Sequence, residues 1–346
     1  MKDKKLTLVI LICGLALSTL TGCNSDDSAI EYIIPVVNRC NEPFSFDDYF
    51  KKENTVCVNF DDEYPVAAMI HDVFFTDEYA FILDIVNRNL SKIDLEKGKV
   101  VNQIQVKRNQ TVLSGDDEHL YLLRCGNVDI IYEYDMDLTP IDSFKLKNVY
   151  ASSFSRIKDG FIFLNARESR NKGRYVITNS NITKAVSYKK LGERPKTYDK
   201  FDPIMIISSE VFIRDSHGKV LCFDFENNDG YMYDGKNLKR LFHIGTDVSD
   251  PAAVPLKNTQ VIYSLNGNIL FHYYNEDGTD GVAYFDKNNN LVAQGPSYDT
   301  GAEGLFRYTF RQVGKKLVRI RMEMPEERGE YPYKSTQAQI DFYRLK

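Results

Sequence analysis

Histidine and carboxylate side chains have the widest capacity for chemistry in this chain. No two of the histidines stand at a metal-binding spacing such as four residues apart, so we predict no metal site. One of them, His217, is next to Gly218 and is expected in a turn. The five histidines are His71, His119, His217, His243 and His272.

Carboxylates gather in three short stretches that could, in principle, supply a catalytic pair. A glycosidase needs two carboxyl groups roughly 5 to 10 Å apart. Each stretch adjoins a predicted turn, which favours solvated turn residues, and the chain has no tryptophan for a sialidase-type aspartate box. We therefore predict no catalytic residue and keep a glycosidase or lyase acting on polysaccharide as the alternative function. The stretches are Asp61-Asp62-Glu63, Asp116-Asp117-Glu118 and Glu326-Glu327.

Charge and motif content exclude several other classes of function. The net charge is −5 and no basic tract is present, so nucleic acid is not an expected partner. The sequence contains no phosphate loop, no dinucleotide fingerprint and no Gly-x-Ser-x-Gly elbow. We predict that the protein uses no cofactor.

The first 22 residues have the pattern of an export signal. Three lysines precede an apolar run, Leu6–Leu17, which is shorter than the about 20 residues that a transmembrane helix needs. Leu20-Thr21-Gly22-Cys23 then resembles a bacterial lipobox. The resemblance implies that Cys23 becomes an acylated N-terminus and that a lipid attaches the protein to a membrane. An uncleaved anchor and an ordinary secretory signal are the alternatives.

The polar stretch after the lipobox bears on location. Asn24-Ser25-Asp26-Asp27-Ser28 is short and acidic. It resembles the surface-export signal of Bacteroidetes lipoproteins, although a generic linker has the same composition. We expect an outer-membrane lipoprotein that faces the cell exterior.

Four further cysteines follow Cys23. An exported chain meets oxidising conditions, and four cysteines allow three pairings among which a sequence cannot choose. Three of them, Cys57, Cys125 and Cys222, sit inside apolar runs and are predicted to be small buried hydrophobic residues. The fourth is Cys40.

A repeat organises the rest of the chain. Short runs rich in Val, Ile, Phe and Tyr alternate with Gly, Asn and Asp, which predicts strands and hairpins. The runs recur about every 40 to 50 residues, the period of a β-propeller with four-stranded blades. We predict an all-β, six-bladed propeller. The expected divisions are a signal peptide at 1–22, a lipidated tether and pre-propeller segment at 23–50, and the propeller at 51–346.

The last repeat predicts how the ring closes. It supplies only three strands, and we expect Thr55–Phe60 to add the fourth, which removes an open sheet edge. Middle strands should be buried on both sides between blades, so Phe163 is expected in the core. The three strands are Gly304–Gln312, Lys316–Met322 and Thr336–Leu345.

Several sequence elements together resemble one known family. Val220-Leu221-Cys222-Phe223 is followed by a Tyr-containing strand and by Phe242-His243-Ile244-Gly245, and the chain finishes with Ile340-Asp341-Phe342-Tyr343-Arg344-Leu345-Lys346. This order is similar to the six-bladed, NHL-like β-propeller lipoproteins of gut Bacteroidetes. The resemblance implies the propeller fold and work at the cell surface, and it implies no particular reaction.

Polar residues on the predicted inner strands are the candidate ligand contacts at the mouth of the central channel. Two of them, Arg156 and Arg214, would repel each other unless a carboxylate partner or an anionic ligand lies between them, which predicts a preference for acidic ligands. Structural roles in the channel are the alternative. We predict a monomeric, non-catalytic binding or scaffold protein for a glycan, a peptide or an outer-membrane protein. The candidates are His71, Arg156, Arg214, Tyr263 and Arg307.

The lipobox makes a direct prediction. Cys23→Ala removes the thiol that would be acylated, so the variant should leave the membrane fraction. Fractionation followed by a carbonate wash measures this. A variant that still sediments after the wash contradicts the lipobox.

Overall fold

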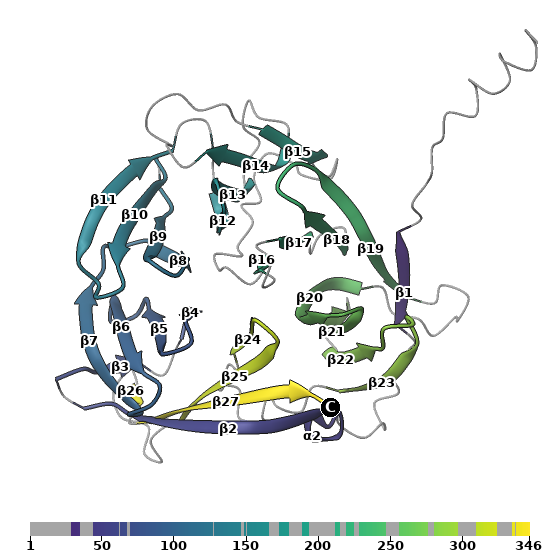
Figure 1. The fold of residues 1–346 in the computed structure, drawn as a ribbon, viewed down its shortest axis with the longest axis horizontal. Coiled ribbons are helices and arrows are strands. Elements are labelled where there is room, and N and C mark those ends of the chain that lie inside the picture. The colour runs from purple at the N-terminus through teal and green to yellow at the C-terminus, as the bar shows by residue number, and fades with distance from the viewer. Residues whose placement is uncertain are drawn as a thin grey trace, which may run out of the picture.

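The protein is a ring of mainly antiparallel sheets in a β-propeller arrangement, in which each of the larger sheets has an edge strand nearest the centre (Figure 1). The fold is taken from a computed structural model. Within the described residues, no helix has the length and apolar character needed to cross a membrane. The structure describes residues 29–34, 44–61, 63–67, 70–126, 128–146, 149, 151–165, 173–179, 189–193, 212–214, 219–224, 228–246, 256–275, 280–296, 309–323, 334–335 and 337–346.

Four sheets stand separately around the ring. In chain order, the second sheet of the ring contains β8 (Gln110–Gly115), β9 (His119–Arg124), β10 (Ile130–Asp135) and β11 (Pro140–Lys145). The third sheet contains β12 (Ala151–Ile157), β13 (Gly160–Asn165), β14 (Gly173–Asn179) and β15 (Lys189–Glu193). The next contains β16 (Phe212–Arg214), β17 (Val220–Asp224), β18 (Asp229–Tyr233), β19 (Leu238–Thr246) and β1 (Ile30–Ile34). The last contains β20 (Leu256–Leu265), β21 (Asn268–Asn275), β22 (Asp280–Phe285) and β23 (Leu291–Pro296).

An eight-stranded sheet completes the ring. It runs in the order β24 (Thr309–Val313), β25 (Lys316–Glu323), β27 (Gln337–Leu345), β2 (Phe50–Asn59), β7 (Lys99–Gln105), β6 (Asn89–Asp94), β5 (Tyr79–Asp84) and β4 (Asp72–Phe75). Its two halves meet at the single pair Asn59–Lys99. We call the half formed by β4 to β7 the first sheet. A two-stranded sheet, β3 (Val66–Ala67) with β26 (Lys334–Ser335), and one short helix, α2 (Phe46–Tyr49), are the remaining elements.

Aspartates at strand ends set the hairpin turns. The Oδ1 atoms of Asp94, Asp135, Asp234 and Asp286 each accept backbone N–H groups from residues two to four positions further on. Such side-chain bonds stabilise tight turns. Asp therefore sets a hairpin turn in four different repeats, which confirms the hairpins predicted from Gly, Asn and Asp between the apolar runs.

Apolar side chains fill the spaces between neighbouring sheets. Buried residues form six clusters among the described residues. Five clusters each draw on two adjacent sheets, and the sixth lies between the two halves of the eight-stranded sheet. The middle strands carry most of this core, because both of their faces are covered: β5 and β6 are buried at five of six positions each. The core therefore lies around the ring between sheets.

The N-terminal part of the chain closes the ring. β2 pairs antiparallel with β27 from Phe50 opposite Leu345 to Asn59 opposite Gln337. The predicted closing strand, Thr55–Phe60, is confirmed, although the observed strand begins five residues earlier. β2 thus places the first and last parts of the propeller in one sheet (Figure 1).

A second N-terminal strand was not predicted. β1 pairs parallel with β19, with Tyr32 opposite Ile244. Tyr32 is 3% exposed, and its ring lies 4.8 Å from that of Phe285 and 5.3 Å from that of Phe271. The segment expected to be a tether ahead of the propeller therefore contributes an outer strand to it.

Phe163 on β13 lies in the apolar core between the second and third sheets. Its side chain is fully buried, as predicted, and its ring lies 6.0 Å from that of Phe154. Phe163→Ala should lower the free energy of unfolding by about 3 to 5 kcal/mol, because the backbone cannot close the cavity. Chemical denaturation measures the change. Ile141→Ala, at a position 52% exposed, is the control and should cost less than about 0.5 kcal/mol. A loss below about 1 kcal/mol for Phe163→Ala contradicts the packing.

Candidate functional site

The two ends of the ring carry different connections. At the turn end, residues 76–78, 116–118 and 158–159 link each inner strand to the next strand outward. At the opposite, connection end, residues 85–88, 106–109 and 125–129 make the other links. Each inner strand runs from the connection end to the turn end.

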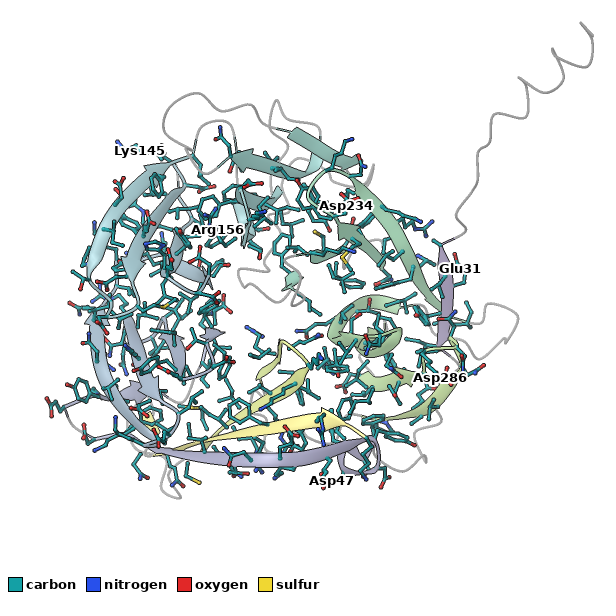
Figure 2. The ribbon with its side chains drawn as sticks, viewed as in Figure 1. Glu31, Asp47, Lys145, Arg156, Asp234 and Asp286 are labelled. Carbon is teal, nitrogen blue, oxygen red and sulfur yellow. The ribbon has the colours of Figure 1, made fainter. Side chains whose placement is uncertain are left out.

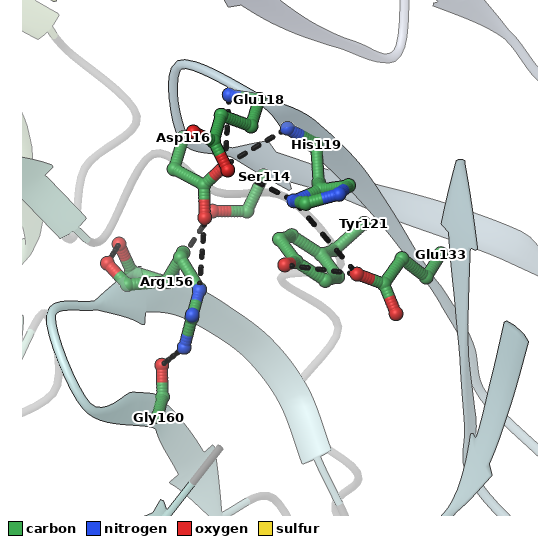
Figure 3. Close-up of polar contacts among 9 residues, drawn as sticks. Ser114, Asp116, Glu118, His119, Tyr121, Glu133, Arg156 and Gly160 are labelled. Atoms are coloured by element: carbon green, nitrogen blue, oxygen red, sulfur yellow. Dashed lines mark hydrogen bonds and ion pairs between the residues drawn. The ribbon is translucent and has the colours of Figure 1, made fainter. Parts of the chain in front are cut away.

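Five polar or aromatic side chains converge at the turn end, between the second and third sheets (Figure 3). Asp116 directly follows β8, while His119 and Tyr121 lie on β9 and Glu133 lies on β10. Arg156 comes from β12 in the neighbouring sheet. We call these five residues the turn-end cluster.

Asp116 organises the cluster. Its Oδ1 accepts the N–H groups of Glu118 at 3.1 Å and His119 at 2.8 Å, which closes the turn. Its Oδ2 accepts Nε of Arg156 at 3.0 Å. Burial acts to raise the pKa of Asp116, but the two backbone bonds and the Arg156 guanidinium lower it overall. The carboxylate is therefore held in its charged form.

Arg156 ties the two sheets together. Its Nη1 donates to the carbonyl oxygen of Gly160 at 2.7 Å, and its guanidinium lies 5.0 Å from the ring of Phe161 and 5.6 Å from that of Tyr121. Glycine is required at this position for another contact, because a Cβ on Gly160 would overlap the carbonyl oxygen of Thr178 on the neighbouring strand β14. The carboxylate partner that the sequence argument required for Arg156 is Asp116 of its own chain.

His119 occupies the more open side of the cluster. Its side chain is 32% exposed, with Nδ1 3.8 Å from Oδ1 of Asp116 and 3.9 Å from Oε1 of Glu133. The Tyr121 hydroxyl donates to the same Glu133 oxygen at 3.3 Å. Burial and the charge of Asp116 raise the pKa of Tyr121 well above its usual value, so the phenol stays protonated. An imidazole beside two carboxylates can bind a ligand or exchange a proton.

The structure separates the predicted ligand contacts. Arg156 belongs to the turn-end cluster, whereas His71 lies just before β4, at the connection end, and donates its N–H to Leu83 at 2.9 Å. Tyr263 is fully buried between sheets and its hydroxyl donates to the carbonyl oxygen of Lys315 at 3.1 Å. Burial raises its pKa to about 12. The prediction that Tyr263 lines an open mouth is corrected: it is a core residue.

Other predicted residues are not fully described. Arg214 ends β16, an inner strand, and its side chain is not among those described. Arg307 and the lipidation residue Cys23 lie outside the described residues. Their roles in binding and anchoring stay predictions.

The predicted burial of the cysteines holds only in part. Cys222 is buried and Cys125 is half-buried, but Cys57 is exposed, and no disulfide joins these three to one another. Cys57 alternates with buried Val56 and Val58 on β2, so its side chain faces outward. Burial raises the pKa of the Cys222 thiol well above its usual value. Cys40 lies outside the described residues.

Sequence reasoning missed the three residues that complete the cluster. The stretch at Asp116 was correctly predicted as a turn, but nothing marked His119, Tyr121 or Glu133 as its neighbours. Glu133 stands opposite Tyr121 in the β9–β10 register, a relation that only the paired strands establish. Among the described residues, no group of three or more His, Cys, Asp or Glu side chains is placed to hold a metal ion.

Comparisons with known proteins show the fold and no more. No family model and no curated protein matches the chain. It is similar to the crystal structure of a predicted exported protein from Bacteroides fragilis, with 12% identity and a TM-score of 0.63 over 92% of this chain and 99% of that one. A DUF4221 family member from Bacteroides vulgatus matches with 8% identity and a TM-score of 0.56, over 86% and 98%. A shared fold at such identity does not define a site.

The Asp116–Arg156 pair predicts a pH-dependent contribution to stability. The folded-state pKa of Asp116 is lowered, so its ionised form stabilises the fold at neutral pH, and this contribution disappears as the pH falls through the lowered pKa. Asp116→Asn should cost roughly 1.5 to 3 kcal/mol at neutral pH. The difference from wild type should shrink as the pH falls from about 5 to about 2.

Denaturation curves at several pH values measure this. Asp142→Asn is the control, because Asp142 is exposed and forms no ion pair with the residues that the structure describes. Its stability should follow wild type at every pH. A destabilisation by Asp116→Asn that stays constant across the acid range contradicts the assignment.

Proposed function

We propose that the ring has six blades. The eight-stranded sheet then counts as two blades, β4 to β7 and β24, β25, β27 with β2, which share only the pair Asn59–Lys99. Each half has four strands, as the separate sheets do apart from the added β1. The six apolar clusters support this count, because a closed ring of six blades has six interfaces.

We propose that the protein is a surface-anchored lipoprotein whose propeller acts as a non-catalytic binding or scaffold module. The lipobox at Leu20-Thr21-Gly22-Cys23 and the fold shared with an exported Bacteroides protein support envelope localisation. The ligand would be a glycan, a peptide or an outer-membrane protein. The observation that carries the proposal is the turn-end cluster, which is ordered across two sheets and still partly exposed.

The hydrogen bonds of the cluster favour recognition over catalysis. Asp116 is engaged by its own turn and by Arg156, and Glu133 accepts the Tyr121 hydroxyl, so these groups are held in place before a ligand arrives. Such preorganisation lowers the entropic cost of binding. Glu133 and His119 remain accessible in part, with 15% and 32% of their side chains exposed. Together they offer acceptors and a ring nitrogen to the hydroxyl groups of a sugar or the N–H groups of a peptide.

The turn-end cluster does not support the preference for acidic ligands that the sequence predicts. Arg156 already neutralises Asp116, so an anionic ligand would have to displace a carboxylate held by three hydrogen bonds. The exposed Asp117 and Glu118 beside it would also repel an anion. We therefore propose a neutral or cationic ligand for the turn end.

Glycan and peptide arrays test the proposal with the full chain. Wild type should bind a subset of neutral or basic ligands, and His119→Ala combined with Glu133→Gln should weaken that binding at least tenfold. Asp159→Asn, at an exposed turn position of the same end, is the matched control and should bind as wild type. Absence of any ligand above background contradicts the binding role. Release of reducing ends from a polysaccharide, lost in Glu133→Gln, would replace it with the glycosidase or lyase alternative.

A further inference from the structure

Basic side chains gather at the connection end of the ring, opposite the turn-end cluster. They come from the loops and strand ends of the first two sheets. Four are exposed and Arg124 is half-buried. We call this set the basic patch: Arg88, Lys107, Arg108, Arg124 and Lys145.

The charges of the basic patch are not neutralised by neighbouring carboxylates. None of its five members forms an ion pair with a residue that the structure describes. Elsewhere basic side chains pair closely: Lys97 lies 2.6 Å from Asp94, and Arg240 lies 2.7 Å from Asp229. The whole chain has a net charge of −5, so its composition does not account for five cations without an ion pair in one region.

Backbone contacts bring the loops of the basic patch together. The carbonyl oxygen of Arg88 accepts the N–H of Val106 at 2.7 Å, which places Arg88 next to the loop that contains Lys107. The carbonyl oxygen of Asn109 accepts the N–H of Cys125 at 3.1 Å, which joins that loop to the end of β9. The loops that carry Arg88, Lys107 and Arg108 are thus neighbours in space of each other and of the end of β9, which carries Arg124.

Tyr132 contacts two members of the basic patch. The Nζ atom of Lys107 lies 4.6 Å from the centre of its ring, and Nη1 of Arg124 donates to its hydroxyl at 3.4 Å. Arg124 and Lys145 both stand opposite Ile130 in the strand register, so they belong to one row across β9, β10 and β11. Two strand spacings, roughly 9.5 Å, separate their backbones.

The acidic residues in these connections point inward. Asp84 is fully buried and its Oδ1 accepts the N–H groups of Val86 and Asn87. Asp129 is 5% exposed and accepts the N–H groups of Gly126 and Ala151. These carboxylates hold loops in place, and the outward-facing charge of the connections between the first two sheets is positive.

We propose that the basic patch binds an acidic polysaccharide that carries about one anionic group per disaccharide. The backbones of Arg124 and Lys145 lie roughly 9.5 Å apart in one row of the sheet, which is close to the length of a disaccharide. In an extended acidic peptide, side chains on one side recur about every 7 Å, which fits less well. Guanidinium and ammonium groups also donate to sugar hydroxyls. An anionic membrane is a poorer match, because Val128 is the one large apolar side chain that is strongly exposed among the described residues of these loops.

The experiment is calorimetry of the full chain with hyaluronan decasaccharide, which has one carboxylate per disaccharide, at low and high salt. Wild type should bind it, with affinity that falls as salt rises because exposed charges are screened. A neutral maltooligosaccharide of equal length should not compete. The double variant Arg124→Gln with Lys145→Gln should weaken binding at least tenfold. The double variant Arg88→Gln with Arg108→Gln should weaken binding by a similar factor, and it leaves the contacts of Tyr132 in place.

The matched control is Lys158→Gln with Lys287→Gln, two exposed lysines away from the basic patch, which should bind as wild type. Equal affinity in all variants, or loss in the control as well, overturns the proposal. So does binding to phosphatidylglycerol vesicles without binding to the oligosaccharide. The turn-end cluster takes no part in this test, so the two proposals can fail separately.

Discussion

The pairing of β2 with β27 is the contact on which the rest of the structure depends. It places residues 50–59 beside residues 337–345, and without it β27 would present an open edge that could pair with another chain. Val56 and Val58 of β2 also belong to the apolar cluster that includes Ile320 and Ile340. Because each sheet packs only on its neighbours, loss of one contact would open the whole ring.

A buried carboxylate fastens this closure. Asp341 on β27 has no exposed surface, and it accepts the Thr55 hydroxyl at 2.7 Å and Nη2 of Arg321 at 2.9 Å. Lys52 of β2 lies 3.3 Å away. Burial acts to raise the pKa of Asp341, but Thr55, Arg321 and Lys52 lower it overall. The closing strand is therefore held by side-chain charge as well as by its backbone ladder.

Closure of the ring also allows its turn end and its connection end to carry differently charged groups. The inner strands are linked by polar contacts, such as Arg311 to Asp72 at 2.7 Å and the N–H of Leu113 to the same carboxylate at 2.9 Å. With the strands held in this way, the turns at each end keep fixed positions. The turn-end cluster and the basic patch then face opposite directions, with self-compensated charge at one end and unpaired cations at the other.

The sequence by itself determined the all-β class, the repeat, the aspartate turns, the burial of Phe163 and the closing strand. These follow from local patterns, because alternation, turn chemistry and period are properties of consecutive residues. Family resemblance added the expected location, and no local pattern named a ligand.

The tertiary structure decided which distant residues meet. The sequence did not predict β1, because its five residues contain no pattern that indicates pairing with β19, some 200 positions further along the chain. Tyr263 was expected at an open mouth, yet it is buried, since the side of a strand that faces a neighbour depends on sheet packing. Asp116, His119, Glu133 and Arg156 form one cluster because strand register and the contact of two sheets bring them together. A one-residue shift in register would have turned those side chains to the other face.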